Sequence, residues 1–275
     1  MAAIPKKVVE RLAKGIKRFQ PILTTSKTRD DGEGDTVMIV TDMLAEVFGY
    51  DKFSEVTAEF AIKSTYCDLA IKLDGDVRGL IEVKAVGTEL KENHLKQAVD
   101  YAANQGVDWA VLTNGLRWRV YKVTFGKPIG QELVVDIDFC NLNSRSGDDL
   151  ALLFLWCKEG WARSVLGEYQ AQRQALSRFV LAATILSEPV VDTIRRELRR
   201  MSPDVKIRTE EIREALMNEV LKREVVEDDK AEEARKKLAR ASAKALRAIP
   251  PSGKATASES SGAGPTDEDE SSLPS

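Results

Sequence analysis

Histidine is nearly absent from this chain of 275 residues, since His94 is the only one. A single histidine excludes zinc sites built from several histidines and disfavours nuclease motifs that depend on histidine. Cysteine is also scarce: Cys67, Cys140 and Cys157 are odd in number and show no Cys-x-x-Cys spacing. This pattern argues against a disulfide framework and against a cysteine zinc site.

Long apolar runs are missing as well. The longest, residues 179–186, is far shorter than a membrane-spanning helix requires, and the first residues carry no apolar core of a signal peptide. Ser252-Gly253-Lys254 lacks the upstream glycine and the preceding strand of a phosphate-binding loop, so no ATP site is expected. We therefore expect a cytoplasmic protein without a membrane partner.

The charge is unevenly distributed, although the net charge is only −3. Residues 1–29 contain eight basic residues and one acid, Glu10, whereas residues 249–275 contain Lys254 and five acids. The basic start predicts a helix with apolar positions facing inward. Its charged face either follows a phosphate backbone or is simply solvated, and the pattern leaves both open. The last residues are rich in serine, glycine, proline and acids, which predicts a disordered tail.

Residues 66–84 carry the strongest functional signal in the chain. Two runs alternate between apolar and other residues, as strands do, so each run has one apolar face and one face with charge. The charged face holds Asp68 on the first strand, and Glu82 and Lys84 on the second. Three ionisable groups are therefore expected on one patch of a small sheet.

The loop between these strands sets their register. Asp74-Gly75-Asp76 predicts a short hairpin. If these three residues form the loop, Leu73 pairs with Val77, and the same even register places Asp68 opposite Glu82.

Two neighbouring carboxylates raise each other's pKa unless a cation lies between them. A divalent metal removes this conflict, and carboxylate oxygens with retained waters are the usual ligands of Mg²⁺. A nearby lysine then orients a water or stabilises charge on a phosphate, as in metal-assisted phosphodiester cleavage. The alternative is an ordinary hairpin with a surface salt bridge between Lys84 and Asp68.

The next elements extend this pattern to an α/β core. Residues 91–105 have helical spacing, with Gln97 and Tyr101 four residues apart and thus on one face. Two strands follow, 108–113 and 116–121, separated by the turn signal Asn114-Gly115. The order is strand, strand, helix, strand, strand, with the helix crossing over the sheet.

Beyond residue 139 the pattern is helical, with helices expected over 148–158, 161–186, 189–201 and 209–224. The expected organisation has five segments: a basic N-terminal helix at 1–29, a nuclease-like core at 30–140, a helical region at 141–226, a charged helix at 227–248 and a disordered acidic tail at 249–275.

These motifs together resemble the PD-(D/E)XK nuclease superfamily, and more narrowly the N-terminal nuclease domain of type I restriction enzyme R subunits. The resemblance covers roughly residues 30–125. The features that carry it are Tyr66-Cys67-Asp68-Leu69-Ala70, Ile81-Glu82-Val83-Lys84-Ala85, Gln97-Ala98-Val99-Asp100-Tyr101 and Leu112-Thr113-Asn114-Gly115 followed by Trp118. Two features depart from the pattern: no proline precedes Asp68, and no ATPase motor follows the core.

The resemblance implies a restriction-endonuclease-like core, with a mixed central sheet flanked by helices. It also implies the roles of the site residues, with Asp68, Glu82 and Lys84 as the catalytic core and Gln97 and Tyr101 in support. The metal ligands are then expected to be Asp68, Glu82, the backbone carbonyl of Val83, and an acid at the start of an earlier helix. Glu33 is the expected acid, and Glu46 is a weaker candidate for the same role.

The expected function is a Mg²⁺-dependent restriction or defence endonuclease that hydrolyses DNA, with Mn²⁺ able to substitute. The expected partners are DNA and other restriction or defence subunits, and a homodimer stays open. The alternative is a nucleic-acid-binding or assembly subunit that keeps the nuclease fold without cutting. A third option is a nuclease that acts only inside a larger defence complex.

Overall fold

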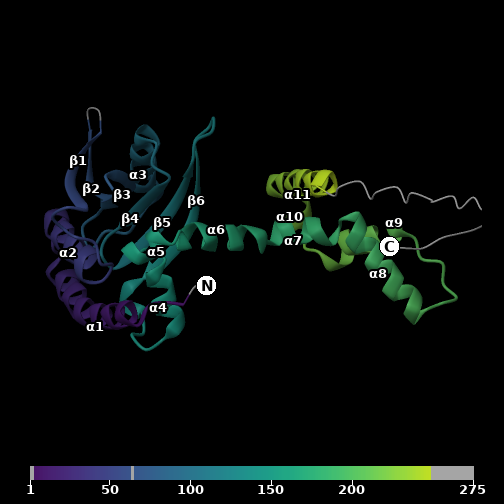
Figure 1. The fold of residues 1–275 in the computed structure, drawn as a ribbon, viewed down its shortest axis with the longest axis horizontal. Coiled ribbons are helices and arrows are strands. Elements are labelled where there is room, and N and C mark those ends of the chain that lie inside the picture. Colours follow the sequence, from purple (N-terminus) through teal and green to yellow (C-terminus); the bar gives the residue numbers. More distant parts are fainter. Residues whose placement is uncertain (1–2, 63–64, 249–275) are drawn as a thin grey trace, which may run out of the picture. The chain divides into compact units, whose positions relative to one another are not determined.

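The computed structural model describes residues 3–62 and 65–248 (Figure 1), so the expected tail at 249–275 lies outside the described residues. The chain divides into two compact units, Met1–Leu176 and Ser177–Ser275. The division falls inside the helical region expected at 141–226, and the five-segment organisation stays a prediction. Within the described residues, no helix is both long enough and apolar enough to cross a membrane.

A six-stranded sheet forms the centre of the first unit, with the strands in sequence order from β1 to β6 (Figure 1). All neighbouring pairs are antiparallel except β3 and β4, which are parallel because α3 crosses over between them. The mixed sheet and the order of its elements confirm the expected core. The strands are β1 (Val56–Ile62), β2 (Thr65–Leu73), β3 (Asp76–Val83), β4 (Trp109–Thr113), β5 (Arg117–Thr124) and β6 (Gly130–Asp138).

The hairpin between β2 and β3 has a shorter loop than expected. Leu73 pairs with Asp76, not with Val77, so the loop contains only Asp74 and Gly75. Both loop residues have positive φ, 55° and 85°, as a two-residue hairpin turn of the primed type requires.

A bulge in β3 then restores the expected register. Ile71 pairs with Gly79 while Lys72 pairs with Val77, which leaves Arg78 as the extra residue. From there Leu69 pairs with Ile81, so the strands continue with Asp68 toward Glu82. The loop prediction was wrong by one residue, and the bulge compensates for it.

Helices cover both faces of the sheet. On one face α1 (Lys6–Arg29) and α2 (Glu33–Glu46) pack on strand residues such as Leu69 and Ile81. On the other face α3 (Glu92–Gln105) packs on Ala70 and Leu80. The expectation of one apolar and one charged face for these two strands was therefore wrong in part, because the crossover helix buries the second face too.

The remaining elements of the first unit follow the sheet. They are a short 3-10 helix η1 (Phe139–Asn141), α4 (Gly147–Phe154), α5 (Lys158–Ala162) and α6 (Val165–Ala175). The helix expected over 161–186 is interrupted twice. Ser164 has a left-handed backbone conformation with φ 55°, and the hydroxyl of Ser177 caps a new helix by accepting a hydrogen bond from the N–H of Val180.

The second unit consists of helices and the segments that connect them, with no strand among its described residues. Its longest helix, Asp229–Ala248, lies within the segment 227–248 that the sequence predicted as a charged helix. The elements are α7 (Arg178–Ile185), α8 (Glu188–Met201), α9 (Thr209–Ala215), a single π-helical stretch η2 (Leu216–Val220), α10 (Arg223–Glu227) and α11 (Asp229–Ala248).

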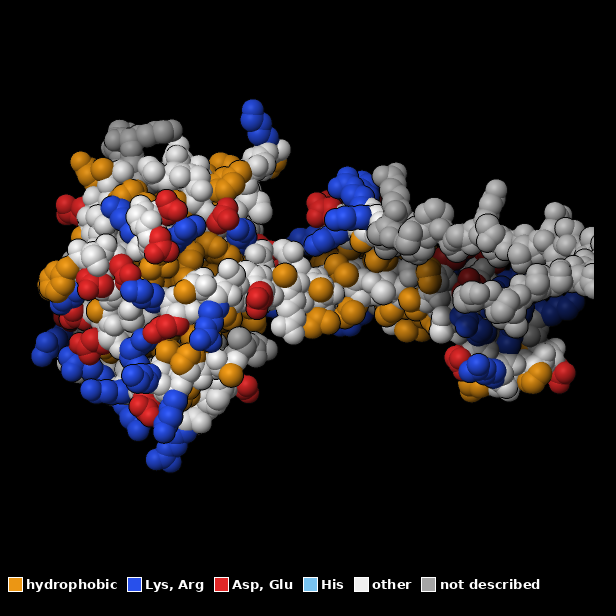
Figure 2. All heavy atoms as spheres, viewed as in Figure 1, with side chains coloured by type: hydrophobic (Ala, Val, Ile, Leu, Met, Phe, Trp, Pro, Cys, Tyr) orange, Lys and Arg blue, Asp and Glu red, His pale blue; other side chains and the backbone are white. Residues whose placement is uncertain are grey.

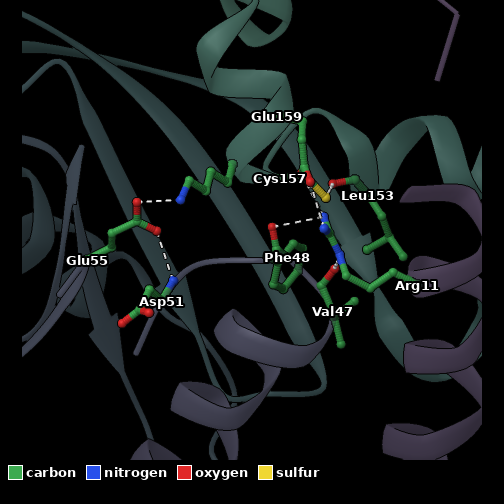
Figure 3. A network of polar contacts seen from close by, with 9 residues as sticks. Arg11, Val47, Phe48, Asp51, Glu55, Leu153, Cys157 and Glu159 are labelled. Carbon is green, nitrogen blue, oxygen red and sulfur yellow. Dashed lines mark hydrogen bonds and ion pairs between the residues drawn. The ribbon is translucent and has the colours of Figure 1, made fainter. Parts of the chain in front are cut away.

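A polar network fixes α1 to the end of α2 and to α5 (Figure 3). The guanidinium of Arg11 donates to the carbonyl oxygens of Val47 and Phe48, and it donates to both carboxylate oxygens of Glu159 at 2.7 Å. The hydrogen bond from Arg11 lowers the pKa of Glu159, despite partial burial. This ion pair joins residues 148 positions apart in the chain and so ties α1 to α5.

Candidate active site

The candidate site lies on the paired strands β2 and β3. Asp68 is partly buried, and its Oδ2 accepts a hydrogen bond from the backbone N–H of Val83 at 2.7 Å. The register of β2 and β3 brings this about, because it carries Asp68 to the end of the neighbouring strand. Asp68 is thus hydrogen-bonded to the peptide group that joins Glu82 to Val83.

Glu82 is almost completely buried, at 1% exposure. Its Oε1 accepts a hydrogen bond from Nζ of Lys84 at 2.7 Å, whereas its Oε2 is buried without a hydrogen-bond partner in the described part of the chain. Burial raises the pKa of Glu82 to about 7, against the hydrogen bond from Lys84, and the charge of Asp68 adds to the rise. The site therefore contains a carboxyl group that changes charge near neutral pH.

Lys84 lies between the acids of the site. Besides Glu82, its Nζ approaches Oε2 of Glu33 at 3.5 Å. Burial lowers the pKa of Lys84, but the hydrogen bond with Glu82 and the charges of Glu82, Glu33 and Asp68 outweigh burial, so the pKa lies above its ordinary value. Burial also raises the pKa of Asp68, and the N–H of Val83 and the charge of Lys84 offset this only in part. Lys84 is consequently a firmly protonated cation among three carboxylates.

The structure separates the two acids that the sequence offered on the earlier helix. Glu33 is the first residue of α2, as expected, and it reaches Lys84. Glu46 is the last residue of α2 and pairs instead with Arg18 at 2.9 Å. A helix of 14 residues is about 20 Å long, so Glu46 does not belong to this site.

Gln97 and Tyr101 lie on α3 and bond to each other, with Nε2 of Gln97 donating to the Tyr101 hydroxyl at 3.0 Å. Their position on one helix face is confirmed. Within residues 3–62 and 65–248, no hydrogen bond or ion pair joins either of them to Asp68, Glu82 or Lys84. Their role in catalysis stays a prediction.

Two buried residues support the site, a role that the sequence did not indicate for either of them. Thr36 on α2 accepts a hydrogen bond from the N–H of Val86 at 3.0 Å through its hydroxyl, and Asn114 donates from Nδ2 to the carbonyl oxygens of Val86 and Thr88. Both side chains are buried. Together they hold the loop that follows Lys84, and this loop fixes the backbone next to the lysine.

The donors of the candidate site are carboxylate oxygens, which hard divalent cations prefer. Within the described residues, no group of three or more His, Cys, Asp or Glu side chains is arranged to hold a metal ion. The chemistry of the donors nevertheless fits Mg²⁺, which takes one or two carboxylates and retains water. Oε2 of Glu82 is a buried carboxyl oxygen without a hydrogen-bond partner among the described residues, and a bound cation would give it one.

An α/β sheet with an acid on one strand and Glu-x-Lys on the next is of the general kind of the PD-(D/E)XK nuclease superfamily. Residues 39–137 match the family model described as type I restriction enzyme R protein N terminus. This match confirms the resemblance seen in the sequence and indicates a restriction-type nuclease or nuclease subunit. A search of the curated proteins found no match, and neither did a search of the solved structures.

Proposed function

We propose that this protein is a Mg²⁺-dependent endonuclease of the restriction or defence type that hydrolyses phosphodiester bonds in DNA. The observation that carries the proposal is the position of Lys84, whose Nζ lies 2.7 Å from Glu82 and 3.5 Å from Glu33. A scaffold has no need of a buried Glu-Lys pair next to Asp68. Such an arrangement costs desolvation energy, and ionisable groups that are perturbed in this way cluster at functional sites.

Each side chain has a distinct role in this proposal. Asp68 and Glu82 hold the metal, helped by the carbonyl of Val83 and by Glu33. When bound, the metal supplies charge neutralisation at the phosphate and a more acidic water. Lys84 then holds the attacking water and stabilises the developing negative charge, since its raised pKa keeps it protonated. Mn²⁺ is expected to substitute for Mg²⁺.

Gln97 and Tyr101 orient the site or contact the DNA backbone in the same proposal. Other restriction or defence subunits are its further partners, in a cytoplasmic setting, and a homodimer is compatible with it.

A second candidate function is a non-cutting nucleic-acid-binding or assembly subunit with the same fold. One observation favours it: both carboxylates already have partners within the chain, since Asp68 bonds to Val83 and Glu82 bonds to Lys84. A nuclease that works only inside a larger defence complex would share these features with the free subunit.

Cleavage by the purified protein distinguishes these functions. Plasmid DNA, single-stranded DNA and RNA are incubated with Mg²⁺, with Mn²⁺ and with EDTA, and the same series is run with Glu82→Gln. Glu46→Gln is the matched control, because it makes the same chemical change at the far end of α2, where Glu46 pairs with Arg18. Cleavage by the wild type and by the control, but not by Glu82→Gln, supports the nuclease. Equal cleavage by all three proteins would mean a contaminating activity, and DNA binding without any cleavage would favour the non-cutting subunit.

A further inference from the structure

The geometry points to the outer face of α1 as the surface that binds the backbone of duplex DNA and leads it to the candidate site. This inference rests on the proposed function, because it names where that site's substrate lies on the protein. We call this surface the α1 stripe. It consists of the basic residues Lys6, Lys7, Lys14, Lys17 and Arg29.

Packing determines which face of α1 is turned outward. The buried positions Val8, Leu12, Phe19 and Leu23 recur at helical spacing and anchor one side of the helix in the core. The stripe residues are all exposed, and Figure 2 shows Lys and Arg side chains gathered where Figure 1 places α1. The basic face is therefore held in a fixed orientation by the core beneath it.

The stripe residues have no ion-pair partners within the described part of the chain. In the described part of the chain, none of the five stripe residues forms an ion pair with an acid, whereas the neighbouring Arg18 pairs with Glu46. Glu10 is the single acid on the helix. Unpaired cations on a rigid helix can neutralise DNA phosphates and so release the counterions that are condensed on the DNA.

The stripe ends beside the candidate site. Arg29 is the last residue of α1, and Glu33, which contacts Lys84, follows four residues later. Four residues span at most about 14 Å, so the end of the stripe lies within that distance of the acid of the site. The residue after α1 also lies against the loop that follows Lys84, because the side chain of Asp30 is next to Gly87.

The length of the stripe favours duplex DNA as its partner. A helix of 24 residues is about 36 Å long, which corresponds to about one turn of B-DNA. The four lysines in the first half of α1 can contact phosphates along the duplex, while Arg29 at the far end contacts the backbone near Lys84. An anionic membrane surface would also attract lysines, but membrane binding would not explain why the stripe ends beside the candidate site.

The test measures DNA binding by the full-length protein in EDTA, where no metal-dependent hydrolysis occurs. Fluorescence anisotropy with a 30-base-pair duplex is recorded between about 50 and 200 mM salt, the range over which phosphate contacts change affinity steeply. The variant Lys7→Ala/Lys14→Ala/Lys17→Ala is expected to bind at least ~10-fold more weakly near 100 mM salt. Its salt slope is expected to fall by about 2 to 3, close to one per phosphate contact removed.

The matched control is Lys127→Ala/Lys206→Ala/Lys237→Ala, which removes the same charge from exposed lysines elsewhere. Alanine favours helix, so the stripe variant should fold, and circular dichroism checks this. An unchanged affinity in the stripe variant, or an equal loss in the control, would overturn the inference. So would stripe-dependent binding to phosphatidylserine vesicles in place of DNA. If DNA binding depends on the stripe but no cleavage occurs in Mg²⁺, the proposed nuclease activity is wrong and the α1 stripe is still supported as the DNA-binding surface.

Discussion

Asp68 and Val83 are joined by a hydrogen bond of 2.7 Å from the backbone N–H of Val83 to the carboxylate of Asp68. Val83 lies between Glu82 and Lys84, so this bond attaches the acid of β2 directly to the segment that carries the other two site residues. The three side chains therefore do not move independently, and the consequences of changing them differ in ways that can be measured.

Lys84→Ala and Asp68→Ala are expected to separate water activation from metal binding. Lys84→Ala should lose cleavage at least ~100-fold, about 3 kcal/mol of barrier, while it retains Mg²⁺ binding. Asp68→Ala should lose both, because too few anionic oxygens remain for a hard cation. Single-turnover cleavage and calorimetric Mg²⁺ titration measure the two quantities. Loss of Mg²⁺ affinity in Lys84→Ala to the same extent as in Asp68→Ala would contradict the assigned roles.

Glu82 should make the free energy of unfolding depend on pH in the absence of metal. Its pKa is about 7 in the folded protein and 4.5 ordinarily, so between these values the folded state holds more protons than the unfolded state. Stability therefore falls as pH rises through this window, by ~3 kcal/mol in total. Urea unfolding in EDTA at pH 4.5 and at pH 8 measures this difference in the free energy of unfolding. Glu82→Gln should lose this component, and an unchanged pH dependence in that variant would show that Glu82 is not its source.

Mg²⁺ should stabilise the folded protein more at pH 8 than at pH 6. The reason is that the cation requires Glu82 in its charged form, and the raised pKa leaves much of it protonated at pH 6. Saturation at 100 times the dissociation constant adds about 2.7 kcal/mol. Thermal unfolding with and without Mg²⁺ tests this, with Glu82→Gln expected to lose the effect and Glu46→Gln to keep it. Equal stabilisation of both variants would place the cation elsewhere.

Thr36→Val should loosen the loop behind Lys84. The substitution leaves the N–H of Val86 without its acceptor, which costs about 1–3 kcal/mol for a buried group. Thr41→Val is the matched control, because the Thr41 hydroxyl bonds only to Val37 of its own helix. Denaturant unfolding gives the stability of each variant. If cleavage is detected in the wild type, Thr36→Val should also cut more slowly, and equal behaviour of the two variants would remove the supporting role.

Arg11→Met should destabilise the first unit far more than Arg18→Met does. The substitution removes the ion pair with Glu159 and the hydrogen bonds to the carbonyls of Val47 and Phe48 in a half-buried position. We expect the free energy of unfolding to fall by about 2–4 kcal/mol. The pair of Arg18 with Glu46 is more exposed, so its loss should cost below ~1 kcal/mol. Urea unfolding of both variants measures the difference, and similar losses would mean that the network in Figure 3 contributes little.

The mixed sheet was predictable from the sequence because its signals are local. Alternation marks the strands, and Gly106 ends α3 in the left-handed conformation that glycine favours. The hairpin loop was predicted one residue too long, because a two-residue loop followed by a bulge at Arg78 gives the same register beyond the bulge as a three-residue loop without one. The break at Ser164 had no clear local signal either.

The central part of the site was also predictable, since the register of two strands suffices to bring Asp68 toward Glu82 and Lys84. The supporting residues were not. Thr36 and Asn114 act through hydrogen bonds to partners 50 and 28 residues away, and no periodicity in the sequence encodes such pairings. Only the folded chain shows what these residues hold.

The family match covers residues 39–137, yet residues on either side of it close one apolar face of its sheet. Leu12 and Leu23 come from before the match, Leu153 and Trp156 come from after it, and all four are buried. A gene fusion that transferred the matched segment alone would expose this face to water. Inheritance of the nuclease-like part therefore requires that both flanks travel with it, or that the new host protein supplies an equivalent cover.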